Sequence, residues 1–214
     1  MPSLTTYLMF ISFALAASFT PGPAVMLSIH NAMNLGWRHA IWSSLGNISG
    51  LLLLATLSAL GLNAILQSSD LAFTAVKLMG AAYLVWLGVQ QWRNAPKRAA
   101  SASAEVARQP EPAQRPRGLY VKGLTVAVTN PKAIAFIAAL FPQFLNVSRP
   151  LVPQYVALTL TFMAISLLAL STYAGLAVLA RKRLNGWFAS GWPQRLSGSV
   201  FCAFGLGLLR LSRP

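Results

Sequence analysis

Two short stretches of this 214-residue chain place prolines and polar side chains inside long apolar segments, at residues 4–29 and 119–141. They are Thr20-Pro21-Gly22-Pro23 and Thr129-Asn130-Pro131-Lys132. A proline in a helix interior removes a hydrogen bond and clashes with the preceding turn, at about 3 kcal/mol. Both stretches therefore predict a broken helix. In lipid, such a break is tolerated only where it is buried in protein or faces a wet cavity.

A broken helix offers groups that suit a small zwitterion. The half-helix after the break presents unpaired amide groups and a partial positive charge, while the unwound residues before it expose carbonyl oxygens. An amino acid has one carboxylate and one ammonium group, so it suits a site with both kinds of partner. The predicted substrate-binding residues are Thr20, Pro21, Gly22, Pro23, Asn47, Asn130, Pro131 and Lys132.

Two of these side chains have alternative interpretations. Lys132 is a cation beside the second break, where it binds substrate, snorkels, or pairs with a carbonyl. Asn47 lies on a small, partly polar face with Gly46 and Gly50, whose spacing of four favours close helix packing. Its amide either lines the site or bonds a neighbouring helix.

Few residues could move a proton. His30 follows Pro23 by seven residues and is either a proton carrier or an interfacial residue, and Asp70 is the second candidate. His30, His39 and the single cysteine, Cys202, are too scattered for a metal site. No acid, base and nucleophile come together, so the sequence predicts neither a cofactor nor an enzyme.

The composition is that of an integral membrane protein. Hydrophobic residues make up 56% of the chain and charged residues only 9%, with a mean hydropathy of +0.58. The net charge of +14 would suggest nucleic acid in a soluble protein. Here the cations lie between apolar segments, which favours topology signals and contact with anionic lipid headgroups over nucleic acid.

Six apolar segments are long enough to cross a bilayer. We expect them at residues 4–29, 41–66, 71–91, 119–141, 152–180 and 195–211. The connections after the third and fifth segments carry most of the cations, which places both connections in the cytoplasm and both termini outside. Residues 94–118 are rich in Ala, Ser, Pro and Arg and predict a flexible linker between two three-helix halves, residues 1–93 and 119–214.

An internal similarity supports this division. Residues 77–86 of the third segment align without gaps with residues 195–204 of the sixth, with cation, leucine, glycine and two aromatic positions in step. Because each half has an odd number of spans, the copies would be inverted relative to each other. The expected fold is an all-α membrane protein with six helices, the first and fourth broken by proline. The glycine-rich faces suit packing within one chain or between copies, so monomer and homo-oligomer both stay open.

Three motifs in order resemble the LysE/RhtB family of amino-acid exporters. They are the Thr20–Pro23 break, the run from Lys77 to Gly88, and Thr129–Ala133 followed by Phe141–Phe144. The resemblance covers nearly the whole chain. It implies a bacterial inner-membrane protein that exports amino acids, by proton antiport, with the two breaks as signature elements.

One departure from the family pattern bears on the substrate. Family members often carry an acidic residue in the second or fifth helix, but the matching stretches here contain none. A second positive charge on the substrate would then lack a counter-ion, which favours small neutral amino acids of the homoserine or threonine kind. The alternatives are a passive channel and an exporter of another small metabolite.

Overall fold

The structure, a computed structural model, describes residues 3–68, 70–95, 115–146, 148–179 and 190–210. Every regular element in these residues is helical, which confirms the all-α class. The α-helices are α1 (Leu4–Phe19), α2 (Pro23–Leu35), α3 (Trp37–Ser68), α4 (Asp70–Arg93), α6 (Pro116–Thr129), α7 (Pro131–Ala135), α8 (Leu151–Leu179) and α10 (Trp192–Arg210). A π-helix, η1 (Phe136–Leu140), and a 3-10 helix, η2 (Phe141–Phe144), continue α7.

Both predicted breaks are present. The α1–α2 pair and the pair formed by α6 with α7–η2 are each bent by 51°. Each second half-helix starts with a proline at its first position, where the missing N–H costs no intrahelical bond and φ is already helical. Proline therefore both interrupts the long helix and starts the second half-helix.

Several helix ends differ from the sequence prediction, and two of the differences concern the first segment and the linker. The first segment continues past residue 29 to Leu35, and Gly36, at φ +89°, ends α2 before α3 begins. The polar residues among residues 30–35 lower the mean hydropathy there, so hydropathy alone does not extend the segment to the end of α2. Residues 116–118 of the predicted linker belong to α6, and linker residues 96–114 lie outside the described residues.

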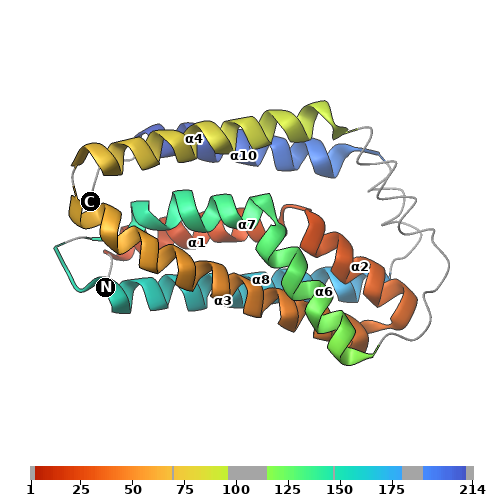
Figure 1. The fold of residues 1–214 in the computed structure, drawn as a ribbon. Coiled ribbons are helices and arrows are strands. Elements are labelled where there is room, and N and C mark those ends of the chain that lie inside the picture. The colour runs from red at the N-terminus through yellow and green to blue at the C-terminus, as the bar shows by residue number, and fades with distance from the viewer. Residues whose placement is uncertain (1–2, 69, 96–114, 147, 180–189, 211–214) are drawn as a thin grey trace.

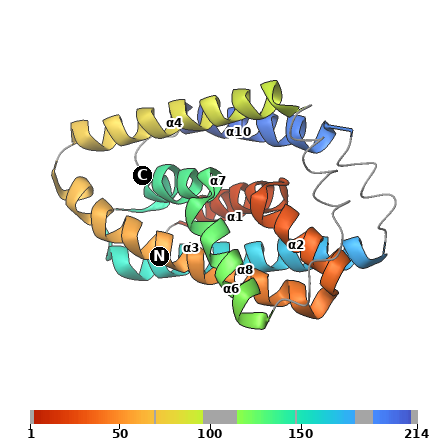
Figure 2. The ribbon, with the colours of Figure 1, turned by 45° about the vertical axis from the view of Figure 1, so that its right-hand side comes forward.

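The helices form an elongated bundle (Figure 1). α4 and α10 lie side by side along one edge, and α1 and α7 lie between this pair and the helices α3 and α8, as Figure 2 also shows. In the described part of the chain, two helices are long and apolar enough to cross a membrane, within Trp37–Leu60 and Leu151–Leu179. Each bent pair passes the same test as one span, which gives up to four.

α3 and α6 approach closely because a glycine on each helix faces the backbone of the other. A Cβ on Gly46 would lie 1.9 Å from the Tyr120 carbonyl oxygen, and one on Gly123 would lie 2.0 Å from that of Ser43. Real Cβ atoms cannot approach so near. The small face predicted on the second segment is therefore a packing face, and it fixes the second break beside α3.

Candidate functional site

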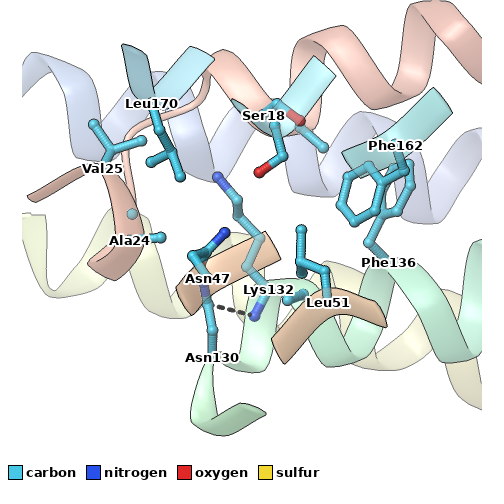
Figure 3. Close-up of a pocket in the computed structure, with 14 residues that line it drawn as sticks. Ser18, Ala24, Val25, Asn47, Leu51, Asn130, Lys132, Phe136, Phe162 and Leu170 are labelled. Atoms are coloured by element: carbon cyan, nitrogen blue, oxygen red, sulfur yellow. Dashed lines mark hydrogen bonds between the residues drawn. The ribbon is translucent and has the colours of Figure 1, made fainter. Parts of the chain in front are cut away.

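A small cavity of about 30 Å³ lies between the two breaks (Figure 3). Four predicted substrate-binding residues line it together: Gly22, Asn47, Asn130 and Lys132. The other lining residues are Ala17, Ser18, Ala24, Val25, Leu51, Ala133, Phe136, Phe162, Ser166 and Leu170. The lining thus comes from both halves of the chain.

Side chains from the second half satisfy the carbonyl groups freed by the first break. The hydroxyl of Tyr173 on α8 donates to the Phe19 carbonyl at 2.7 Å. The Nζ atom of Lys132 donates to the Thr20 carbonyl. These two bonds offset the cost of the interrupted helix, and they join α1 to α7 and α8 at the cavity.

The second break is capped by its own asparagine. Asn130 is 5% exposed, and its Oδ1 accepts from the Lys132 backbone N–H at 3.1 Å, as the dashed line in Figure 3 shows. This bond satisfies one of the unpaired donors at the start of α7. It also holds the Lys132 main chain in place at the edge of the cavity.

The start of α2 has no side-chain cap. Its first intrahelical bond runs from the Met26 N–H to the Gly22 carbonyl, at 2.9 Å. The preceding amide groups, of Ala24 and Val25, belong to residues that line the cavity. Helix geometry leaves these two donors for an external partner, at the positive end of a helix dipole.

The remaining predicted residues, Thr20, Pro21, Pro23 and Pro131, belong to the breaks but not to the described cavity lining. Thr20 and Pro21 are buried, and the Thr20 hydroxyl donates to the Ala16 carbonyl. Pro23 and Pro131 are exposed first residues of half-helices. None of these four residues belongs to the described lining, so their side chains shape the breaks and do not line the cavity.

The two proton-coupling candidates lie apart from the cavity lining described above. His30 is 6% exposed on α2, and its ring nitrogens lie 3.2 and 3.3 Å from the Asn34 side-chain nitrogen. Asp70 begins α4, at the end of the bundle where α1 also begins (Figure 1), and its side chain lies outside the described features. Within the described ranges, no three His, Cys, Asp or Glu side chains group as metal ligands.

Sequence reasoning missed the aromatic wall of the cavity. Phe136 and Phe162 stack with ring centroids 4.4 Å apart and planes 16° apart. Phe141 packs edge-on against both, and its ring also meets that of Tyr155. A π-helix after Pro131 turns Phe136 toward this stack, and no hydropathy pattern signals a π-helix.

Lys132 is the charged member of the described lining, which contains no acidic residue. Its Nζ lies 3.5 Å from the place where a Cβ on Gly22 would stand. The lining therefore presents a cation and the two amide donors at the start of α2, and the Thr20 carbonyl that Lys132 binds lies beside them. This set of groups matches a carboxylate with a nearby polar partner.

Known relatives match this chain along most of its length. An uncharacterized membrane protein of Vibrio cholerae is 34% identical over 94% of both chains. The homoserine/homoserine lactone efflux protein of Salmonella typhimurium is 35% identical over 88% of both chains. The threonine efflux protein of Escherichia coli K12 is 27% identical over 91% of this chain and 93% of its own. No solved structure matches.

A family model confirms the resemblance that the motifs suggested. The model of the LysE type translocator matches residues 15–212, which include both breaks and every residue of the described cavity lining. The chain therefore belongs to the LysE type translocator family.

Proposed function

We propose that this protein is a secondary transporter that exports small neutral amino acids, similar to homoserine or threonine, across the bacterial inner membrane. The observation that carries the proposal is the cavity between the two breaks, where Lys132 faces Gly22 and the uncapped start of α2. The names of the Salmonella and Escherichia coli relatives support the same substrate class.

The amino-acid backbone of the substrate accounts for the polar groups. Its carboxylate binds Lys132 and the amide groups of Ala24 and Val25, which are the charged and dipolar donors of the lining. Its ammonium group binds the Thr20 carbonyl once Lys132 turns to the carboxylate. The amides of Asn47 and Asn130 complete the site.

The substrate side chain is uncharged in this proposal. The described lining supplies a cation but no carboxylate, so a cationic side chain would enter without a counter-ion. Burying such a charge unpaired costs several kcal/mol, by an order-of-magnitude rule. An acidic side chain would compete with the substrate carboxylate for Lys132.

A carrier fits the cavity better than a passive channel. About 30 Å³ holds one or two waters, and the stacked Phe136 and Phe162 close one side. An amino acid therefore enters only after the surrounding helices move. Transport that requires such a motion saturates with substrate, whereas conduction through an open pore does not.

The proposed membrane architecture is six spans in two inverted halves, residues 1–93 and 119–214. α4 and α10 complete the six, because 24 and 19 helical residues reach about 36 and 28 Å. α3 of the first half and α8 of the second run in opposite directions along the bundle, and so do α4 and α10 (Figure 1). The equal bends of 51° at the two breaks also support a repeat.

Efflux is coupled to the proton gradient in this proposal, with His30 as the first candidate and Asp70 as the second. His30 lies on α2, the half-helix whose start faces the cavity, and it is buried. A motion of α2 that opens the cavity would also change the surroundings of His30. The motion of α2 links the two events in this proposal.

The primary test is efflux from bacterial cells that overproduce the protein and are preloaded with a mixture of amino acids. We expect one or a few neutral amino acids to leave faster, with a saturable rate, and a protonophore to abolish the gain. A gain that survives the protonophore would overturn the proton coupling alone. If no amino acid in the mixture moves faster, the proposed substrate class is wrong.

A paired substitution tests the role of Lys132 in the same assay. Lys132→Met keeps an apolar stem of similar length but removes the charge that binds the carboxylate. We expect at least a tenfold loss of efflux, since hydrogen bonds to charged groups contribute about 1.5–3 kcal/mol. Lys122→Met makes the same change on α6, outside the described lining, and should keep efflux near the wild-type rate.

A further inference from the structure

Ser18 is a buried hydroxyl without a partner at the cavity. It lies in the last turn of α1, is 8% exposed, and its Oγ atom makes no hydrogen bond to any described residue. In Figure 3 its side chain points into the cavity from the wall opposite Asn47 and Leu51. No other side chain of the described lining has a fully buried polar atom left unpaired.

Several other hydroxyl groups in α1 and α3 are satisfied within their own helix. Ser12, Ser44 and Thr56 each donate to the carbonyl four residues earlier, at 3.0, 3.0 and 2.9 Å. This bond is the ordinary solution for a serine or threonine inside a helix. Ser18 does not make it, although the Ala14 carbonyl is available at the same spacing. Its hydroxyl is directed to the cavity instead.

The neighbouring polar groups already have partners at the breaks. The Thr20 hydroxyl donates to the Ala16 carbonyl, and Asn130 caps the Lys132 backbone N–H. Lys132 binds the Thr20 carbonyl and is assigned to the substrate carboxylate above. Ser18 is therefore a polar group of the lining that neither the fold nor the bound amino-acid backbone uses.

We propose that Ser18 is a specificity-determining residue, whose hydroxyl binds a hydroxyl group on the substrate side chain. This inference rests on the proposed function, and it narrows the substrates to small amino acids with a hydroxylated side chain. The apolar part of such a side chain lies against Phe136 and Phe162, and its hydroxyl exchanges a hydrogen bond with Ser18 Oγ. The cavity thereby distinguishes threonine from valine, which has a methyl group in place of the hydroxyl.

The discrimination comes from the cost of an unmade hydrogen bond. A purely apolar cavity separates two side chains of equal size only weakly. When valine binds, however, Ser18 Oγ stays buried and unpaired, whereas threonine satisfies it. We expect wild-type protein to prefer each hydroxylated amino acid over its apolar counterpart by about tenfold or more.

The test uses purified full-length protein in proteoliposomes, with the amino acid identified by the cell assay as the labelled probe. Unlabelled threonine and valine form one competitor pair, and homoserine and norvaline, which has a methyl group in place of the hydroxyl, form the second. Ser18→Ala should reduce the preference within each pair to about twofold or less. Ser12→Ala removes a hydroxyl from an exposed position of the same helix and should leave both preferences unchanged.

Two results would overturn this inference while leaving the proposed function intact. One is equal competition within both pairs by wild-type protein that transports the probe. The other is an unchanged preference in transport-competent Ser18→Ala protein. If that variant fails to reach the membrane, Ser18→Cys, with a weaker donor of similar size, is measured in its place. Wild-type protein that transports no amino acid would overturn both proposals.

Discussion

Asn130 illustrates how one side chain can serve both the fold and the site. Its Oδ1 caps the start of α7, and the residue also lines the cavity beside Lys132. A loss of transport after mutation could therefore come from a frayed helix or from a missing ligand contact. Two substitutions separate these causes, because serine caps helices as well as asparagine does but lacks the longer amide.

We expect Asn130→Ala and Asn130→Ser both to lower efflux by about tenfold, since both remove the amide from the cavity. Only the alanine variant should also lose stability, by about 1 kcal/mol for the missing cap. Efflux is measured in overproducing cells, with the amount of protein in the membrane as the reference. Normal efflux from the serine variant would show that the amide acts as a cap only.

The breaks could be predicted at the level of elements because proline and glycine act locally. The prolines of Thr20–Pro23 and of residues 129–132 interrupt a helix whatever packs around them, and both interruptions are found. Ser18, Phe136 and Phe162 were not singled out, since their role depends on which helices face each other. The π-helix that positions Phe136 has no signature in the sequence.

The close packing of α3 on α6 predicts that a larger residue at the contact lowers the stability of the bundle. Gly123→Ala places a Cβ about 2.0 Å from the Ser43 carbonyl oxygen, so α3 and α6 must move apart. Overpacking of this kind costs about 1–3 kcal/mol. We expect a lower thermal unfolding midpoint for the purified variant in detergent, and lower efflux because α3 carries Asn47 to the cavity.

Gly118→Ala is the matched control, since it lies on the same helix and its added Cβ meets no atom within 4 Å. Alanine also favours helix over glycine by about 1 kcal/mol. The unfolding midpoint of this variant should equal or exceed that of the wild type. Equal midpoints for the two variants would contradict the packing argument.

At the scale of the whole molecule, charge predicts how the bundle crosses the membrane. In Figure 1, α1 begins and α10 ends at one end of the bundle, and the connection from η2 to α8 lies there too. The described cations of that end are Arg149 and Arg210, the last residue of α10. The other end has more, at helix ends and turns: Arg38, Arg93, Arg115, Arg117 and Arg195. Cytoplasmic loops carry the excess of Lys and Arg. The arginine-rich end is therefore cytoplasmic in our proposal.

Cysteine labelling in intact cells tests this orientation. The native Cys202 is first replaced by alanine, and single cysteines are then placed at Ser148 and Gly118, both exposed and at opposite ends of the bundle. A thiol reagent that cannot cross the inner membrane should label Ser148→Cys in intact cells, and Gly118→Cys only after the membrane is opened. The reverse pattern would place both termini in the cytoplasm. Labelling of both positions in intact cells would contradict a bundle that spans the membrane from one end to the other.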